Sequence, residues 1–410
     1  MATILSLLSS GTQAKGFDVI GHRGAPNLRP EHSYESYLLA QQNGADYIEF
    51  DVMPSKDGIL MCTHSFELDE VTNVASVAKF ADRKKTKTVE FKTYTGWFIE
   101  DFTAAELQEL RLKERYPNPR GTKFDTLFVM PTLEEAIRFV NAITPSSITL
   151  SNQKIKLYIE TKHPKYFANV LNVEVNQLLV NELSKFEYLE WTMFQSFEST
   201  SLIAIRKILQ DRSITPLGYV MLVDVNRTQF DTNQPYSEYL TEEGIRKIAN
   251  FGGTGIGPHY SLVTKEWVEK VHANNLITHP YTFRSEPYFM QKTPYSSFKD
   301  MVTTFIEIGV DGIFTEDLIQ TREILSEYQN NGIRNVIMAL TIIAIAIIAI
   351  VTIASVVTAC VFKRRKQFAS STLPETVSSQ QHLTKSSNGK VYGIDESAES
   401  DQARLIPNKQ

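Results

Sequence analysis

Two carboxylates stand two residues apart in the apolar run YIEFDV, residues 47–52, where a buried strand would normally exclude charge. Side chains at positions i and i+2 of a strand point to the same face, so Glu49 and Asp51 would share one pocket. Two carboxylates held this close raise each other's pKa unless a cation lies between them. The pair therefore predicts a site for a hard divalent metal, Ca²⁺ or Mg²⁺, which prefers oxygen ligands.

The run KLYIETK, residues 156–162, brings a further carboxylate and a lysine to the end of the next strand. Glu160 would complete a three-carboxylate metal site with Glu49 and Asp51. Lys162 shares the face of Glu160, and a cation beside a metal is well placed to bind a phosphate. The plainer interpretation of the same residues is a set of ion pairs at strand ends.

The stretch GHRGAPNLRPEHS, residues 21–33, adds groups suited to acid–base chemistry. His22 can transfer protons near neutral pH, and Arg23 offers a two-pronged donor for a phosphate. His64 ends the run GILMCTHS, residues 58–65, and could take the opposite proton-transfer role. Two histidines, a carboxylate-held metal and two cations together predict a site that cleaves phosphodiesters.

Several other residues near strand ends are weaker candidates. His259 and His279 could line the pocket, whereas His163 is expected to face away from Lys162. The aromatic side chains that could contact the alcohol part of a substrate, or equally serve packing, are Tyr281, Phe283 and Trp97.

Eight short apolar runs between Gly16 and Glu316 alternate with amphipathic helical stretches, which favours parallel strands. Eight is the number that closes a (β/α)8 barrel, and several runs end in polar residues where such barrels place their chemistry. An open doubly wound sheet is the alternative. The predicted strands lie at residues 17–22, 47–52, 156–162, 192–197, 217–223, 254–257, 276–282 and 311–317.

The third of these strands begins about a hundred residues after the second, too far for one crossover connection. We therefore expect residues 66–130 to form an insertion on the face that carries the chemistry. Residues 58–65 should form a short extra strand after a turn at Lys56-Asp57-Gly58.

The composition is that of a globular protein, with 42% apolar and 22% charged residues in 410. The formal charge of −5 gives no reason to expect nucleic acid as a partner. Only two cysteines are present, and Cys360 lies in a membrane-like segment, so a disulfide with Cys62 is not expected.

Residues 336–362 contain no charged side chain and would form roughly 40 Å of helix, enough to span a bilayer. The basic run KRRK, residues 363–366, follows at once, which predicts a cytoplasmic tail and an extracellular or lumenal domain at residues 16–331. This topology requires an export signal, for which residues 1–15 are the candidate, although they lack a basic start.

Residues 363–410 are rich in Ser, Gln and Thr and poor in aromatic side chains, so we expect a disordered tail. The tail ends near a pattern similar to an acidic dileucine sorting signal, formed by Asp401, Leu405 and Ile406. If a sorting adaptor binds there, the protein would reside in an endolysosomal compartment rather than at the cell surface.

The motifs HRG, PEHS, GADYIEFDV, KDG with its following histidine, and YIETK together resemble the glycerophosphodiester phosphodiesterase family, and the insertion is similar to that of its periplasmic, calcium-using branch. The similarity extends from about Val19 to Asp317. One departure is Ser65, where the family usually has Asp after the second histidine. Glu316 lies in another departure, and we assign it no role.

The resemblance implies a TIM barrel that hydrolyses glycerophosphodiesters to glycerol 3-phosphate and an alcohol with a divalent metal, Ca²⁺ favoured over Mg²⁺. It implies His22 and His64 as the acid/base pair and Arg23 and Lys162 as phosphate ligands. Glu49, Asp51 and Glu160 would ligate the metal. The added C-terminal helix would make the chain a membrane-anchored ectoenzyme.

Two other functions fit the same barrel. One is a lysophospholipase-D-like activity on lipids, which a nearby bilayer would favour. The other is an inactive barrel that serves as a receptor or adhesion module, although every acid/base, metal and phosphate position is filled.

Overall fold

Eight parallel strands pair side by side in a nearly closed barrel, in the computed structural model that describes residues 16–144 and 155–370. Their spatial order is β10-β9-β8-β7-β6-β2-β1-β11, so neighbours in sequence are neighbours in the sheet. The predicted TIM barrel is confirmed. The strands are β1 Asp18–Gly21, β2 Tyr47–Pro54, β6 Lys156–Thr161, β7 Thr192–Ser196, β8 Gly218–Val223, β9 Gly255–Pro258, β10 Ile277–Thr278 and β11 Gly312–Thr315.

The barrel closes between β11 and the segment that follows β10. The amide of Asp311 donates to the carbonyl of Thr278 at 3.0 Å, and that of Phe314 donates to Pro280 at 3.0 Å. The amide of Phe283 in turn donates to the carbonyl of Phe314 at 2.9 Å. The last strand therefore joins the seventh strand's extension on one side and the first strand on the other.

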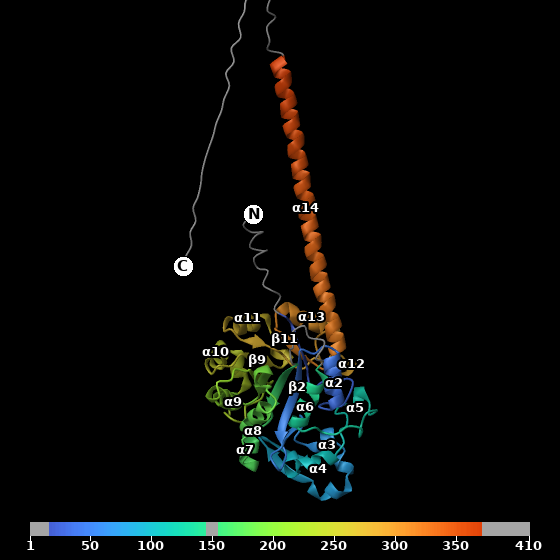
Figure 1. The fold of residues 1–410 in the computed structure, drawn as a ribbon, viewed down its shortest axis with the longest axis vertical. Helices are drawn as coiled ribbons and strands as arrows, with labels where there is room; N and C mark the ends of the chain where they lie inside the picture. Colours follow the sequence, from blue (N-terminus) through green and yellow to red (C-terminus); the bar gives the residue numbers. More distant parts are fainter. Residues whose placement is uncertain (1–15, 145–154, 371–410) are drawn as a thin grey trace, which may run out of the picture. The chain divides into compact units, whose positions relative to one another are not determined.

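Helices surround the strands on the outside of the barrel (Figure 1). Local sequence signals fix several of their ends: Thr132 and Glu135 form a capping box at the start of α6, and Gly309 ends α13 with a φ of 96°. The helices are α2 Tyr34–Gln42, α6 Leu133–Ile143, α7 Pro164–Leu171, α8 Val175–Ser184, α9 Ser199–Asp211, α10 Glu242–Asn250, α11 Lys265–Ala273, α12 Pro287–Met290 and α13 Phe298–Ile308. Short 3-10 turns are η4 Leu189–Trp191, η5 Tyr236–Leu240 and η6 Tyr260–Leu262.

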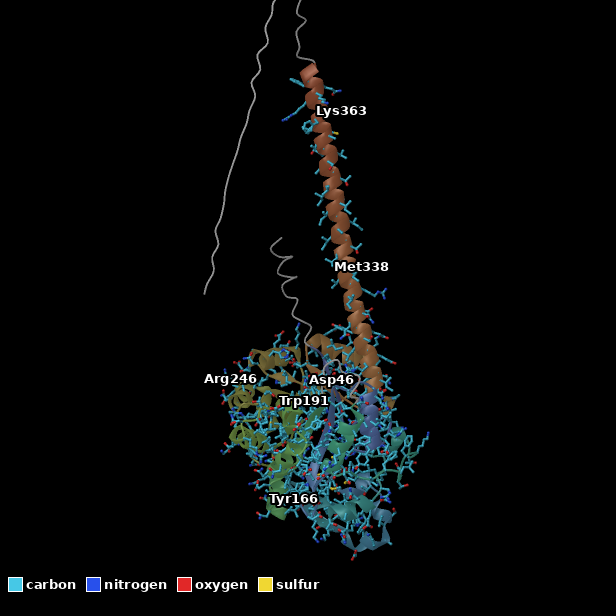
Figure 2. All side chains as sticks on the ribbon, in the orientation of Figure 1. Asp46, Tyr166, Trp191, Arg246, Met338 and Lys363 are labelled. Carbon is cyan, nitrogen blue, oxygen red and sulfur yellow. The ribbon has the colours of Figure 1, made fainter. Side chains whose placement is uncertain are left out.

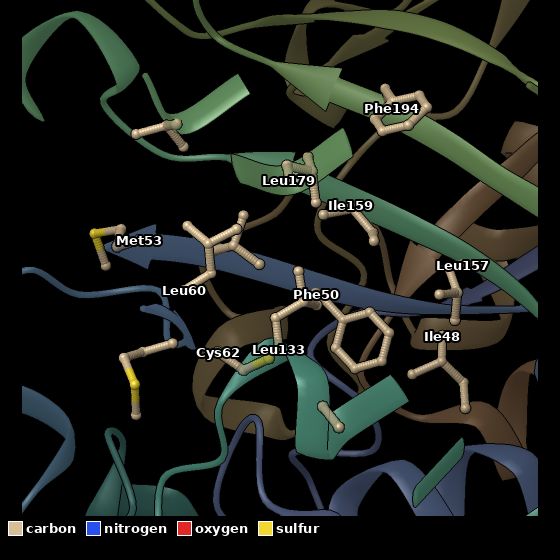
Figure 3. Packing of buried hydrophobic residues seen from close by; sticks show 14 of the residues in the cluster. Ile48, Phe50, Met53, Leu60, Cys62, Leu133, Leu157, Ile159, Leu179 and Phe194 are labelled. Atoms are coloured by element: carbon tan, nitrogen blue, oxygen red, sulfur yellow. The ribbon is translucent and has the colours of Figure 1, made fainter. Parts of the chain in front are cut away.

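The alternation of side chains along β2 separates the core from the site. Ile48 and Phe50 point away from the barrel axis, and Phe50 packs near Leu133 of α6 (Figure 3). Tyr47, on the other face of the strand, packs inside the barrel with Tyr158 of β6. Because the period of a strand is two, Glu49 and Asp51 share the inward face with Tyr47.

The insertion after β2 begins with β3, Leu60–Cys62, which pairs antiparallel with the end of β2, as predicted. Its helices α3 and α4 lie beyond the carboxyl end of β2 (Figure 1). The insertion therefore covers the end of the barrel toward which the parallel strands run. Its other elements are α3 Leu68–Val71, η1 Val74–Ser76, η2 Ala78–Arg83, the hairpin β4 Lys85–Val89 and β5 Lys92–Gly96, η3 Ile99–Asp101, α4 Ala104–Glu109 and α5 Pro117–Arg120.

The helix α14, Leu318–Ser370, contains the apolar segment predicted to cross a membrane. Its mean hydropathy reaches 3.1 in the most apolar window, and that window is 0% buried, so the helix is long and apolar enough to span a bilayer. Side chains stand out from it on all sides between Met338 and Lys363 (Figure 2). The chain divides into two units at Asn335 and Val336. The candidate signal at residues 1–15 and the sorting residues Asp401, Leu405 and Ile406 lie outside the described residues.

Candidate active site

The carboxyl ends of β1, β2 and β6 bring the predicted residues together. Asp51 and Glu160 are register partners in the parallel pair β2–β6. A pocket of about 220 Å³ opens at this end of the barrel. Its lining includes six of the seven predicted site residues, His22, Arg23, Glu49, His64, Glu160 and Lys162.

Glu49 is buried at the floor of this pocket with neutral donors as its close partners. Its Oε2 accepts the backbone N–H of Arg23 at 2.7 Å, and its Oε1 accepts the amide of Gln195 at 3.2 Å. Burial, followed by repulsion from Asp51, raises the pKa of Glu49 well above its ordinary value. The positive charge near this carboxyl group is too small to offset its burial, so the ionised form is disfavoured.

Asp51 does not line the pocket, and its pKa is shifted in the opposite direction from that of Glu49. Burial would raise its pKa, but Lys162 at 3.4 Å, His32 at 3.0 Å and Arg23 at 3.3 Å hold the pKa of Asp51 well below its usual range. Asp51 is therefore ionised, with a cationic or hydrogen-bonding partner on several sides.

The pKa of Glu160 is raised, like that of Glu49 and unlike that of Asp51. Its Oε1 lies 2.8 Å from the ammonium of Lys162. Burial nevertheless raises the pKa of Glu160 to about 8, because Lys162 is opposed by the neighbouring Asp51. Two of the three predicted metal ligands are thus carboxyl groups that an added cation would stabilise in the ionised form.

The donor atoms of His32, Glu49 and Asp51 lie within 4.8 Å of one another, which fits a single metal ion. His32 also bonds the hydroxyl of Tyr37 at 3.0 Å through its other ring nitrogen, so its ring is fixed between Tyr37 and Asp51. Glu160 does not belong to this close group, and its role as a ligand stays a prediction. From the sequence, His32 is expected only to lie beside the site at the start of a helix, and its place among the possible metal ligands is not predicted.

His22 is buried at the end of β1 and is held by Glu316, the residue to which no role was assigned. Its Nδ1 lies 2.9 Å from Oε1 of Glu316. Burial, then the charge of Arg23, lowers the pKa of His22 to about 4 despite that carboxylate. A neutral His22 donates from Nδ1 to Glu316, because an ionised carboxylate can only accept, and Nε2 is then left without a proton.

Glu316 is itself fixed by two arginines. Burial would raise its pKa, but Arg284, whose Nη2 lies 2.7 Å away, and Arg120 keep the pKa of Glu316 well below its ordinary value. Arg120 comes from α5 of the insertion, so the insertion supplies a contact that orients His22 indirectly. The sequence could not show this pairing, since the partners lie 196 residues apart.

His64 lies half-buried at the edge of the pocket, and its Nδ1 is buried with no hydrogen-bond partner within the described chain. Burial, then Arg23 and Lys162, lowers the pKa of His64 well below its ordinary value. Ser65, the departure from the family pattern, bonds Arg115 and Glu70.

The two predicted phosphate ligands both reach the pocket, but each is also paired with carboxylates. Arg23 donates from Nη1 to Glu31 at 2.9 Å, and Lys162 lies between Asp51 and Glu160. Arg284 lines the same pocket, and its Nε is buried without a hydrogen-bond partner in the part of the chain that the structure describes. Arg284 is thus a third candidate for the phosphate.

The remaining candidates separate into lining and packing residues. Tyr281 and His259 line the pocket. Phe283 is fully buried in the core, and the Trp97 indole donates to the carbonyl of Phe80 at 2.6 Å. The expectation that His163 faces away from Lys162 is wrong, because β6 ends at Thr161 and both side chains line one cavity. His163 has a left-handed φ of 49° and bonds Glu90 at 2.5 Å.

Comparison with known proteins identifies what this arrangement is similar to. The sequence matches the family model described as "Glycerophosphoryl diester phosphodiesterase family" over residues 22–320. It is 31% identical over 326 residues to "Glycerophosphodiester phosphodiesterase GDPD6" of Arabidopsis thaliana, covering 72% of this chain and 82% of that one. It is 26% identical over 333 residues to a glycerophosphodiester phosphodiesterase of Haemophilus influenzae, covering 73% and 86%.

The fold is also similar to that of solved structures. A candidate glycerophosphoryl diester phosphodiesterase from Silicibacter pomeroyi DSS-3 aligns with a TM-score of 0.57 at 21% identity, covering 76% of this chain and 94% of that one. An Oleispira antarctica phosphodiesterase, solved in complex with the product sn-glycerol-3-phosphate, aligns with a TM-score of 0.51 at 18% identity, covering 75% and 96%.

Proposed function

Because the chain belongs to the glycerophosphoryl diester phosphodiesterase family, we propose that it is a metal-dependent hydrolase that converts glycerophosphodiesters into glycerol 3-phosphate and an alcohol. The observation that carries this proposal is the meeting of His22, His64 and Lys162 with two carboxylates around one pocket. The product in the Oleispira antarctica structure, sn-glycerol-3-phosphate, supports this substrate class.

The metal site is part of the proposal. Glu49 and Asp51 would hold the ion with Glu160 or His32, a donor set that suits either Ca²⁺ or Mg²⁺. Ca²⁺ is favoured because the sequence resembles the calcium-using branch of the family. When bound, a divalent ion neutralises phosphate charge and lowers the pKa of an attacking hydroxyl or water. The raised pKa values of Glu49 and Glu160 support a cation at this position.

The histidines would divide the proton transfers between them. Glu316 accepts a hydrogen bond from Nδ1 of His22, so Nε2 has a free lone pair and can act as the general base. His64 would then protonate the leaving alkoxide. A bound phosphate opposes the charges of Arg23 and Lys162, the two cations that lower the pKa of His64.

We also propose that residues 16–331 form the catalytic domain of a membrane-anchored ectoenzyme, with the segment 336–362 in the bilayer. The apolar character of α14 and the basic residues Lys363–Lys366 support a cytoplasmic C-terminus. The catalytic domain would then lie in an extracellular or lumenal space.

An assay of the detergent-solubilised chain tests the activity. Glycerophosphocholine and a lysolipid should be offered in EDTA and again after Ca²⁺ or Mg²⁺ is restored. We expect metal-dependent release of glycerol 3-phosphate from the first substrate. Release of lysophosphatidic acid from the lysolipid alone would favour the lipid-directed activity, and no product from either would favour a receptor.

A further inference from the structure

A second cavity, of about 380 Å³, lies beside the catalytic pocket and is called the alcohol cavity below. The two share part of their lining, which shows that they adjoin. The shared residues are His64, Glu160, Lys162, Phe197 and Tyr281. A phosphate bound beside His64 and Lys162 would thus direct one of its two ester groups into the alcohol cavity.

Aromatic rings form much of the wall of the alcohol cavity. Phe197 stands edge-on to Tyr236 at 5.9 Å between ring centroids and to Tyr281 at 6.0 Å. Phe66 and Tyr94 of the insertion form another edge-on pair at 4.8 Å. The face of an aromatic ring attracts a cation within about 6 Å. Ammonium groups of the chain itself already lie over two of these rings, Lys162 over Phe197 at 5.6 Å and Lys92 over Tyr94 at 4.6 Å.

A buried carboxylate with spare bonding capacity accompanies the rings. Glu198 follows Phe197, is 3% exposed, and accepts the backbone N–H of Lys165 at 3.0 Å through Oε2. Its Oε1 is buried without a hydrogen-bond partner, and no ion pair to Glu198 occurs among residues 16–144 and 155–370. A buried carboxylate of this kind is stabilised by an approaching cation.

The charge balance of the alcohol cavity favours the same kind of ligand. Three of its basic side chains are already neutralised: Arg227 by Asp224 at 2.9 Å, Arg115 by Glu31 at 2.9 Å, and Lys162 by Glu160 at 2.8 Å. The fourth, Lys92, is exposed. Apart from Asp224 and Glu160, which take part in these pairs, four further acidic side chains line the cavity, Glu67, Glu70, Glu90 and Glu198.

We propose that the alcohol cavity binds the leaving alcohol and selects one that carries a positive charge, a quaternary or primary ammonium alcohol such as choline or ethanolamine. The inference rests on the proposed diesterase activity. The ammonium group contacts the face of Tyr236 and approaches Glu198. A neutral alcohol such as glycerol gains neither interaction.

The test compares kcat/KM of the detergent-solubilised full chain for glycerophosphocholine and for glycerophosphoglycerol, whose alcohol is neutral. We expect a preference of about tenfold or more for the choline substrate. Glu198→Gln should reduce that preference at least about fivefold, mainly through a higher KM for the choline substrate. The matched control is Glu190→Gln, since Glu190 is exposed before the other end of β7 and should leave the preference unchanged.

A second variant keeps the test decisive if Glu198→Gln does not fold. Tyr94→Leu removes a half-exposed ring from the hairpin, and it should lower the preference for the choline substrate while Tyr94→Phe retains it. Equal kcat/KM for the two substrates in the unaltered chain, or equal losses on both in the variants, would overturn the inference and leave the diesterase intact. No hydrolysis of either substrate would instead overturn the proposed function.

Discussion

The imidazole of His22 is held by Glu316, a residue almost at the other end of the barrel domain. Its Nδ1 bonds Glu316, and Glu316 is fixed by Arg284 and Arg120. This arrangement selects the tautomer of the imidazole in which Nδ1 carries the proton, and Nε2 takes no part in the bond to Glu316.

Replacing His22 or His64 with Ala should lower kcat by about 10²-fold or more, because each removes one of the two proton transfers. The fold should persist, since neither side chain belongs to the apolar core. The measurement is glycerol 3-phosphate release at saturating metal, with His272→Gln on α11 as the control. Near-normal turnover in either alanine variant would remove that histidine from the mechanism.

Moderate acidity should not lower the rate. Burial and Arg23 lower the pKa of His22 to about 4, so the ring stays neutral as the pH falls from 7 to 5. In a pH profile at saturating Ca²⁺, kcat/KM should not decrease between pH 7 and 5, and the acid limb should lie near pH 4. An acid limb centred near the ordinary histidine value would contradict the assignment of His22 as the base.

The same shift sets the sign of a stability effect. The folded state binds the His22 proton more weakly than the unfolded state does. The contribution of His22 to stability is thus fully present above the ordinary histidine pKa of about 6.5, and it is lost progressively as the pH falls toward 4.

At the scale of elements, the parallel register of β2 and β6 is what assembles the carboxylates. Asp51 and Glu160 are partners in that register, and Glu49 lies two residues back on the same face. The carboxyl groups of Glu49 and Glu160 repel Asp51 and each other, so the two strand ends are destabilised until a cation arrives.

Metal binding should therefore stabilise the fold. A metal that binds only the folded state at a hundred times its Kd adds about 2.7 kcal/mol. Thermal unfolding of the EDTA-treated chain should shift to higher temperature when Ca²⁺ is added. Glu160→Gln should shrink this shift, whereas the exposed Glu190→Gln should not. A shift that is unchanged in Glu160→Gln would exclude Glu160 from the metal site.

The positions of the carboxylates on β2 and β6 could be predicted from the sequence, for a physical reason. The period-two alternation in YIEFDV and YIETK places Glu49, Asp51 and Glu160 inward wherever the strands pair in parallel. Residues whose place depends on loops could not be found this way. His32 reaches Asp51 only because the turn after β1 has left-handed residues, and Gly24, at a φ of 93°, packs where a Cβ would collide with Ser36.

Contacts between segments far apart in the chain could not be predicted from the sequence either, because they depend on the tertiary fold. Nothing local marks Glu316 as the partner of His22, and its arginines come from α5 and from the segment after β10. His163 would face away from Lys162 only if the strand continued through both residues. The strand ends at Thr161, and His163 turns to line the alcohol cavity instead.

At the scale of the whole molecule, the chain combines a barrel with an apolar helix. If residues 336–362 cross a bilayer, the full chain should sediment with membranes and resist extraction at alkaline pH. A chain ending at residue 331 should be soluble and keep kcat/KM for glycerophosphocholine within about threefold, because the residues that line the pocket lie between His22 and Phe314. Recovery of the full chain in the soluble fraction would contradict the membrane anchor.

The closing pair of the barrel has a consequence for how the protein is made. β1 bonds β11, and His22 bonds Glu316 across a separation of 294 residues. During synthesis His22 emerges almost at once, yet the strand β11 that precedes Glu316 is among the last parts of the domain to leave the ribosome. Such long-range pairing slows folding. Until residue 316 has left the ribosome, the edge of β1 would stay unpaired and the nascent chain would be inactive and exposed to chaperones and proteases.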